Sequence, residues 1–338
     1  MDVSIPMDPG ATGNERENIN FKASTLSSVT QLALTFGCYL ALSIAANAAF
    51  GASAWIYGGL VIMAALFVVR LFIIQHDCSH LSLFVNKQTN QFIGRCLGVF
   101  TLVPFCYWQR KHNLHHATSG NLDKRGEGDI WMLTLAEYQA ASSRLRWQYR
   151  LYRNPFVMLV LGAFVQFIVK FRLPQIAPAK WQRERRDIHI NNLMIAIYMT
   201  GLISLFGWQT AVITFLLIGA IAGSVGIFLF YVQHQFEDGY WVSSATWDRK
   251  QAALVGSSYL HLPKWFNWLT GHIALHHVHH LNAQIPNYNL APYMHAKQLD
   301  RDGVQLSFKA AVACLFLHLW DEEQQRLISF NDIEGRKS

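Results

Sequence analysis

The sequence predicts an all-α integral membrane protein, with four transmembrane helices in two hairpins and a cytoplasmic helical cap that holds a di-metal centre. Of its 338 residues, 52% are hydrophobic and only 14% are charged, whereas an average soluble domain carries about 25% charged residues. Four apolar segments approach the ~20 residues that a transmembrane helix needs. Eight of the fifteen histidines fall into three tight clusters beside those segments.

The transmembrane helices are expected near residues 30–50, 54–75, 190–208 and 211–232. The links within each pair are short and uncharged, whereas the segments at the other ends are long and rich in arginine. Because basic loops stay on the cytoplasmic side of a membrane, the N- and C-termini and the histidine clusters are expected in the cytoplasm. The same rule explains the formal charge of +7 without a nucleic-acid partner.

The chain is expected to form one membrane domain over residues 28–333, between a flexible cytoplasmic arm, 1–27, and a short tail, 334–338. The arm contains no apolar run and therefore no secretory signal. The five cysteines form no C-x-x-C pair, which is typical of a chain in a reducing compartment.

Three shorter apolar stretches are expected outside the four spans. Residues 155–169 are too few for a span and are interpreted as interfacial or buried. Residues 92–108, which are interrupted by Arg95 and Pro104, are interpreted as a helix at the interface. Between residues 308 and 319, apolar side chains recur at helical spacing and predict an amphipathic helix of the cap.

The histidine clusters have the spacing of metal ligands. Residues three and four apart lie on one face of a helix, with about 5–6 Å between their Cβ atoms, so each cluster can direct two or three imidazoles at one point. Without metal, packed imidazoles would leave buried donors unpaired. The eight predicted ligands are His76, His80, His112, His115, His116, His276, His279 and His280.

Eight ligands are too many for one ion, since a structural zinc site closes with four. Two ions with about four nitrogens each would leave room for a small ligand, which favours oxygen chemistry over a structural role. The imidazoles by themselves leave the metal open, because they suit Zn, Cu, Fe and Ni alike.

Two further histidines are expected to complete the ligand set. His234 follows the fourth span at the level at which His76 follows the second. His272 precedes His276 by four residues and would share its face on a helix; the alternative for His272 is a hydrogen bond to a ligand. His277 falls about 100° away and is expected to face elsewhere. Four histidines stand alone and are not expected to ligate: His189, His261, His295 and His318.

Polar residues near the clusters are candidates to orient the ligands through hydrogen bonds to the imidazoles. These residues are Asp77, Asn121, Asp129, Glu237 and Asp238. The alternative for each is that it caps a helix or pairs with a nearby arginine.

Longer motifs surround the clusters. They are His76-Asp-Cys-Ser-His80, Tyr107-Trp108, the run from His116 to Asp123, Gly128-Asp-Ile-Trp131, the run from Tyr231 to Asp238, the run from His279 to Tyr288, and Leu319-Trp-Asp-Glu322. From about residue 55 to 333 they resemble the membrane fatty acid desaturases with three histidine boxes, most closely the acyl-lipid omega-6 (delta-12) type of bacteria. Three positions depart from the pattern: Ser79 replaces the usual Gly, His272 a frequent Asn, and His261 a usual acidic residue.

The resemblance implies a fatty acyl desaturase of the bacterial inner membrane. Its two Fe ions would use O2 and two external electrons to insert a cis double bond, of the delta-12 (omega-6) type, into an acyl chain on a membrane lipid or an acyl carrier. Zinc is expected to compete for the site after overexpression. The sequence contains no His-Pro-Gly-Gly haem motif, so a separate electron donor such as a ferredoxin or a cytochrome is expected.

Two alternatives remain open from the sequence. An acyl-chain or lipid hydroxylase, or a related oxygenase, would use the same scaffold. A membrane metal transporter or metal-binding protein is an alternative of another class, although transporters place their ligands within the spans and these clusters flank the spans.

Overall fold

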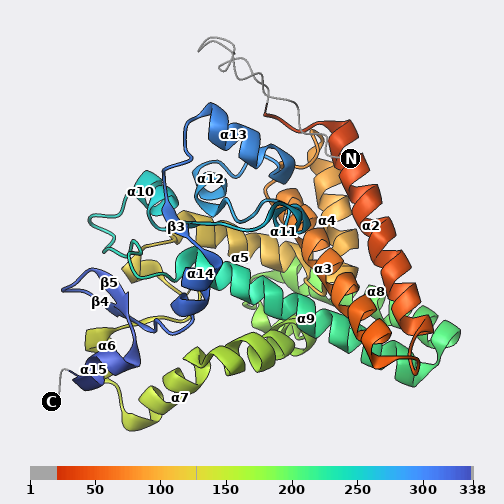
Figure 1. The fold of residues 1–338 in the computed structure, drawn as a ribbon, viewed down its shortest axis with the longest axis horizontal. Helices are drawn as coiled ribbons and strands as arrows, with labels where there is room; N and C mark the ends of the chain where they lie inside the picture. Colours follow the sequence, from red (N-terminus) through yellow and green to blue (C-terminus); the bar gives the residue numbers. More distant parts are fainter. Residues whose placement is uncertain (1–20, 127, 336–338) are drawn as a thin grey trace.

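The computed structural model describes residues 21–126 and 128–335. Four of its helices are long and apolar enough to cross a membrane: α2 (Thr25–Ala48), α3 (Ala54–Ser79), α8 (Gln182–Phe206) and α9 (Trp208–His234). Helix α2 packs against α3, and α8 packs against α9, so the four helices form two hairpins (Figure 1). The predicted fold class is confirmed.

Two of these helices begin earlier than the sequence predicted. Helix α2 begins at Thr25 rather than near residue 30, and Ser24 caps it by accepting a hydrogen bond from the Ser27 N–H. Helix α8 begins at Gln182 rather than near residue 190. Its first turns are highly charged and therefore resemble a loop in the sequence. In the fold, Glu184 of α8 accepts a hydrogen bond from Arg110 at 3.0 Å.

The stretch 92–108 is not one interfacial helix, as predicted, but parts of two helices. Helix α4 (Lys87–Thr101) ends at Leu102, which has a φ of +62°. Helix α5 (Phe105–Thr118) begins after Pro104. Since proline lacks a backbone N–H and a left-handed residue ends a helix, the chain turns between them.

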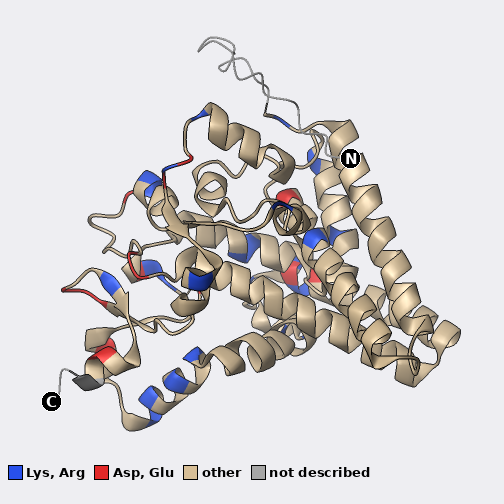
Figure 2. Ribbon diagram, in the orientation of Figure 1, with Lys and Arg blue, Asp and Glu red and all other residues tan. Residues whose placement is uncertain are grey.

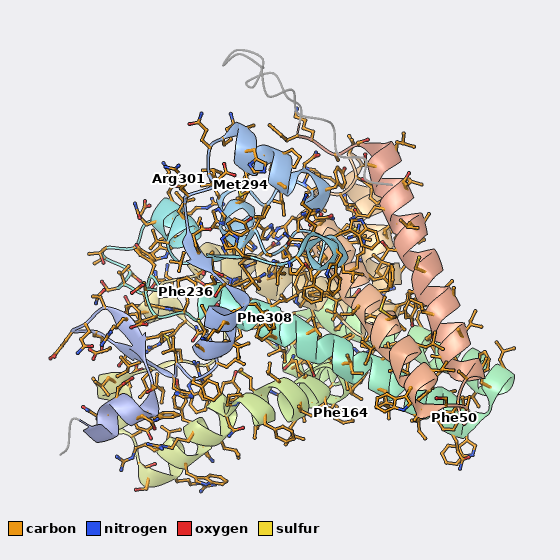
Figure 3. The ribbon with its side chains drawn as sticks, in the orientation of Figure 1. Phe50, Phe164, Phe236, Met294, Arg301 and Phe308 are labelled. Carbon is orange, nitrogen blue, oxygen red and sulfur yellow. The ribbon has the colours of Figure 1, made fainter. Side chains whose placement is uncertain are left out.

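The apolar stretch 155–169 belongs to a bent pair of helices. Helix α7 (Ser143–Arg153) meets the helical segment Val157–Arg172, which contains η2 (Val157–Gly162), η3 (Val165–Val169) and η4 (Lys170–Arg172), at 77°. The two would form a fifth span if they are counted together. Met158 is buried and Phe164 is 37% exposed (Figure 3), so the stretch is partly covered and partly open.

The fully buried Arg153 ties this bent pair to the rest of the fold. Its guanidinium donates hydrogen bonds to the Tyr231 hydroxyl at 2.7 Å and to the Leu317 carbonyl at 2.8 Å. These contacts join α7 to α9 and to the C-terminal segment.

The cap contains short helices and two small sheets that the sequence analysis did not predict. Its helices are η1 (Leu122–Lys124), α6 (Leu135–Ala140), η5 (Pro174–Ile176), α10 (Arg249–Leu254), α11 (Lys264–Leu269), α12 (His276–Leu281), η6 (Asn287–Asn289), α13 (Leu290–Ala296), α14 (Phe308–Cys314) and α15 (Phe330–Gly335). Strands β1 (Leu133–Thr134), β4 (Leu319–Asp321) and β5 (Arg326–Ile328) form one sheet, and β2 (Ser258–Leu260) and β3 (Val304–Leu306) form the other.

The amphipathic helix predicted between residues 308 and 319 is too long. Helix α14 ends at Cys314, and Leu319 begins β4, which pairs in parallel with β1 and antiparallel with β5. The strand depends on partners that are distant in sequence, so helical periodicity alone did not reveal it.

Charge separates the long helices from the cap. Helices α2 and α9 contain no Lys, Arg, Asp or Glu, whereas basic residues gather on α7 and around the cap (Figure 2). At the uncharged end of the first hairpin, Phe50 is 37% exposed (Figure 3). Two of the four long helices are therefore free of charged side chains, and α8 carries its charges in its first turns.

Candidate metal centre

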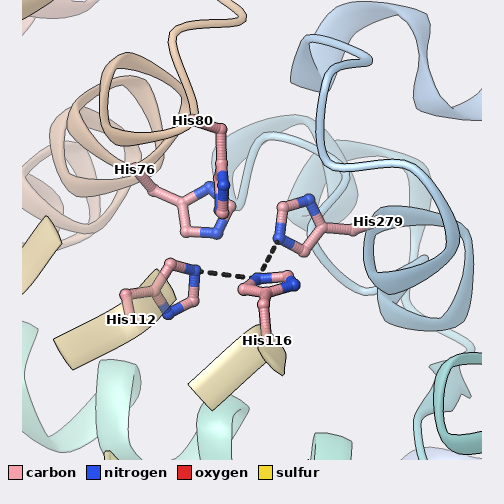
Figure 4. A group of neighbouring side chains, drawn as sticks. All are labelled: His76, His80, His112, His116 and His279. Atoms are coloured by element: carbon pink, nitrogen blue, oxygen red, sulfur yellow. Dashed lines mark hydrogen bonds between the residues drawn. The ribbon is translucent and has the colours of Figure 1, made fainter. Parts of the chain in front are cut away.

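Nine histidines converge from two long helices and two short ones into two neighbouring groups. The five-histidine group contains His76, His80, His112, His116 and His279, and the four-histidine group contains His115, His234, His276 and His280. Within each group, the candidate ligand nitrogens all lie within 4.8 Å of one another. Figure 4 shows the five-histidine group, whose members come from the end of α3, from α5 and from α12.

The two long helices α3 and α9 deliver histidines at their ends. His76 lies in the last turn of α3 and His80 is its C-cap residue, while His234 is the last residue of α9. The Ser79 hydroxyl donates a hydrogen bond to the His76 carbonyl at 2.7 Å and thereby helps to close the last turn. Because α3 and α9 pack together, both ends reach the same site.

The short helices α5 and α12 each contribute to both groups. His112 and His116, four residues apart on α5, enter the five-histidine group, whereas His115 enters the other. In α12 the pair four residues apart, His276 and His280, enters the four-histidine group. Two imidazoles of each cluster therefore share a group, as the spacing predicts, while His115 and His279 enter the opposite group because both helices run between the two groups.

The distances between nitrogens fit two metal ions. The Nε2 atom of His116 lies 3.1 Å from the Nε2 atoms of His112 and of His279 (Figure 4). In the other group, the Nε2 atom of His234 lies 2.9 Å from that of His276. Two nitrogens bound to one ion at right angles, each at ~2.1 Å, would be ~3.0 Å apart.

Two buried nitrogen atoms need a partner. The Nε2 atoms of His76 and His80 are buried and have no hydrogen-bond partner within the described part of the chain. An unpaired polar atom in the interior costs about 1–3 kcal/mol. Both atoms belong to the five-histidine group, and a metal ion there would satisfy them.

The protonation of the imidazoles also suits ligation. Burial, and then the charge of neighbouring imidazoles, lowers the pKa values of His80, His112, His116, His276, His279 and His280 well below the usual value. The rings are therefore neutral at physiological pH. Metal binding requires the neutral form.

Three hydrogen bonds donated by Nδ1 atoms orient imidazole rings of the two groups. His76 Nδ1 donates to the Asp77 carboxylate at 3.2 Å, and His115 Nδ1 donates to the Asp129 carboxylate at 2.5 Å. His234 Nδ1 donates to the Gly256 carbonyl at 3.2 Å. A proton held on Nδ1 leaves the Nε2 lone pair free for a metal. The sequence gives no sign of the Gly256 carbonyl, because every residue has a backbone carbonyl.

The other three candidates form no hydrogen bond to the grouped imidazoles among the described contacts. Asn121 caps η1 by accepting from the Asp123 N–H at 3.0 Å. Glu237 accepts a hydrogen bond from Arg326 at 2.9 Å. Asp238 lies exposed in the turn after α9. Asn121 therefore caps a helix and Glu237 pairs with an arginine, as the alternative interpretation of these residues predicts.

His272 belongs to neither histidine group. His272 could share a face with His276 only on one helix that includes both residues, but α12 begins at His276. His272 instead follows Gly271 in a tight turn, with φ values of +57° and +54°. A Cβ atom at Gly271 would lie 2.7 Å from Ile73 Cγ2, so this turn packs directly against α3.

The remaining histidines also lie outside both groups. His277 Nε2 donates to the Leu299 carbonyl at 3.2 Å. His318 stacks on Phe330, with 4.1 Å between the ring centroids. Among the described residues, the groups likewise exclude His189, His261 and His295.

An apolar cavity of about 730 Å³ borders the metal centre. Its wall includes His76 and His112 of one group and His276 of the other. Most of the remaining wall is apolar and comes from α3, the bent helical segment and α9, including Val68, Phe72, Met158, Leu161 and Ile227. The volume falls in the usual range for small-molecule sites, about 300–1,000 Å³.

Trp108 contributes both to the cavity and to the centre. Its ring lines the cavity and stacks on the His112 ring, with 4.4 Å between centroids and 15° between planes. An apolar ligand in this cavity would lie close to nitrogens that could bind metal.

Comparison with known proteins identifies one protein family. The family model described as "Fatty acid desaturase" matches residues 52–309. A "Fatty acid desaturase" of Bacillus subtilis (strain 168) is 42% identical over 310 residues, which cover 92% of this chain and 88% of that protein. The "sn-1 oleoyl-lipid 12-desaturase" of Synechocystis sp. is 26% identical over 245 residues, 70% of this chain and 65% of that protein. The chloroplastic "Omega-6 fatty acid desaturase" of Spinacia oleracea is 25% identical over 230 residues, 66% of this chain and 49% of that protein.

Proposed function

Because the chain belongs to the fatty acid desaturase family, we propose that it inserts a cis double bond into the acyl chain of a membrane lipid. The observation that carries the proposal is the apolar cavity whose wall contains histidines of both groups. Such a cavity would hold an unactivated hydrocarbon beside a redox centre. A metal store would need no such cavity.

The proposed reaction converts a –CH2–CH2– unit, O2, two electrons and two protons into –CH=CH– and two waters. Two iron ions, when bound, would supply the oxidising chemistry, since imidazole suits iron and an unactivated C–H bond needs a strong oxidant. A separate ferredoxin or cytochrome would supply the electrons.

The role of the protein is to hold the chain and the ligands in place. The cavity walls would select the reacting carbons, because a shift of 1 Å can reduce the rate by about 100-fold. Asp77 and Asp129 fix the rings of His76 and His115 by hydrogen bonds. Trp108 holds the His112 ring by stacking.

For the position of the double bond, we propose the delta-12 (omega-6) type, with a chain that already carries one double bond as substrate. The names of the relatives from Synechocystis and Spinacia support this choice. We also propose that the cap faces the cytoplasm at a bacterial inner membrane. Many basic residues lie on α7 and around the cap (Figure 2), and basic segments stay on the cytoplasmic side of a membrane.

The two alternative functions, a hydroxylase and a metal transporter, differ from a desaturase in reaction product or in the position of the ligands. A hydroxylase would insert one oxygen atom into a C–H bond and release one water. A metal transporter is disfavoured, because His76 and His234 lie at the ends of α3 and α9 rather than near the middle of these spans.

The test is expression in a bacterium that makes monounsaturated but no polyunsaturated lipids. Derivatisation and mass spectrometry would locate any new double bond, with the His112→Ala variant as control. We expect a cis diene with the wild-type chain only. A hydroxylated product would establish the oxygenase, and two bound metal ions without any O2-dependent product would support a metal-binding role.

A further inference from the structure

A chain of hydrogen bonds connects His76 to the N-terminal part of the molecule. Asp77 accepts from His76 Nδ1 with one carboxylate oxygen. With the other oxygen it accepts from both the backbone N–H and the side-chain amide of Asn287, each at 2.7 Å. The Asn287 side chain in turn accepts from Gln31 Nε2 at 2.7 Å and donates to Gln31 Oε1 at 3.3 Å.

The surrounding contacts hold this chain of hydrogen bonds in place. We call residues 21–31 the N-terminal clamp. The Ser24 N–H donates to the Tyr288 hydroxyl at 2.9 Å, and the Asn289 amide donates to the Phe21 carbonyl at 3.0 Å. The Phe21 ring packs edge-on against Tyr293, with centroids 5.2 Å apart. The clamp therefore contacts Asn287 and the residues that follow it.

These contacts correct part of the predicted flexible arm. Residues 1–20 lie outside the described part of the chain, but residues 21–27, which were assigned to the arm, contact η6 and α13 or begin α2. The sequence did not reveal this, because the contacts join positions that are more than 250 residues apart.

Burial makes the orientation of Asp77 depend on Asn287. Asp77 is 2% exposed and Asn287 is 1% exposed, so water does not replace a lost donor easily. In such surroundings a carboxylate keeps a fixed position only while its hydrogen bonds are satisfied. Asn287→Ala would keep the backbone N–H donor but remove the side-chain donor, so the Asp77 carboxylate would be held less firmly and the His76 ring would be less well aligned.

We propose that Asn287 and Gln31 are positioning residues for the five-histidine group. The clamp holds Asn287, Asn287 orients Asp77, and Asp77 directs the Nε2 atom of His76 towards the metal. The inference rests on the proposed metal centre, and it assigns the N-terminal clamp a role in metal affinity. It predicts that the clamp affects one histidine group and leaves the other unchanged.

The test is a Co2+ titration of the full-length, metal-free protein, followed by absorption spectroscopy. Substitution of a residue that hydrogen-bonds to a metal ligand typically reduces metal affinity 10- to 100-fold. We expect Asn287→Ala to reduce the Co2+ affinity of one of the two sites about 10-fold. Because Gln31 of α2 is partly exposed, Gln31→Ala should reduce the Co2+ affinity of the same site less. Tyr39→Phe is the control, because it removes a partly buried hydrogen bond between the same helix and Tyr198, and this bond does not involve Asp77. Its Co2+ affinity should equal that of the wild type.

A double-mutant cycle separates positioning from general destabilisation. If Asn287 acts through Asp77, the double variant Asp77→Asn with Asn287→Ala should bind Co2+ as Asp77→Asn does alone. Additive losses, equal weakening of both sites, or unchanged affinity in both Asn287→Ala and Gln31→Ala would overturn the inference. If the wild type bound no Co2+ at the histidines, the metal centre itself would be refuted.

Discussion

The Nε2 atoms of His115 and His234 lie 3.1 Å apart, although 119 residues separate the two histidines in the sequence. His115 comes from the middle of a clustered motif on α5, whereas His234 stands alone at the end of α9. Their contact shows that the four-histidine group is assembled across the fold. The lone histidine belongs to it as fully as the clustered ones.

This grouping predicts the metal content of variants. His112→Ala and His234→Ala each remove one ligand from a different group, and each should reduce the metal content from two ions per chain to about one or fewer. Elemental analysis of the purified protein measures this, and zinc counts as occupancy because it competes for imidazole sites. The exposed His295 provides the control, since His295→Ala should retain both ions. Two ions in His234→Ala would contradict the assignment.

Asp129 should matter although it does not contact the metal position. It accepts a hydrogen bond from His115 Nδ1, and Asp129→Asn would weaken that bond and disturb the ring. We expect a 10- to 100-fold loss of metal affinity, measured by competition with a chelator. Asp238→Asn changes an exposed carboxylate in the turn after α9 and should have no effect. Equal affinities for the two variants would exclude a role for Asp129.

His272→Asn should retain both metal ions, contrary to the role expected from the sequence. Asn tolerates the φ of +57° at this position, so backbone strain should add little to the change in the free energy of unfolding. His272→Val, by contrast, should cost about 1–3 kcal/mol, because a β-branched residue is strained there. Metal analysis and thermal unfolding measure the two effects. Loss of an ion in His272→Asn would restore His272 to the ligand set.

The cavity predicts a specific effect of filling its wall. An added Cβ atom at Gly226 meets no atom within 4 Å, and Gly226 lines the cavity. Gly226→Leu should therefore occupy substrate space and reduce turnover by up to about 100-fold, with both metal ions retained. Gly201 on α8 also has open space around it but is exposed, so Gly201→Leu serves as the matched control. Equal activity in both variants would argue against the cavity as the acyl site.

His318 should make stability depend on pH. Burial, and then the charges of Arg153 and Arg150, lowers the pKa of His318 to about 3, whereas an unfolded histidine has a pKa of ~6.5. Between these values the unfolded chain binds a proton that the folded chain does not, so stability decreases as the pH falls below ~6.5. In His318→Gln the side chain at this position binds no proton in either state. Its unfolding temperature should therefore fall less than that of the wild type between pH 7 and pH 5, at equal metal content.

The sequence by itself determined the broad architecture. Apolar runs near 30–50, 54–75, 190–208 and 211–232 marked the four long helices, because length and hydrophobicity are local properties of a chain. The spacing of the three histidine clusters marked the region of the metal centre for the same reason. Helix boundaries were less accurate where charged turns, as at the start of α8, are stabilised by ion pairs with distant residues.

Only the tertiary structure decided how the site is divided and supported. The helices α5 and α12 run between two groups, so each group receives three of their histidines, and α3 and α9 supply the rest. The turn at Gly271 keeps His272 off α12, and the Gly256 carbonyl and Asn287 reach the centre from distant segments. These relationships depend on how elements pack in three dimensions, and contacts between distant residues leave no periodic pattern in the sequence.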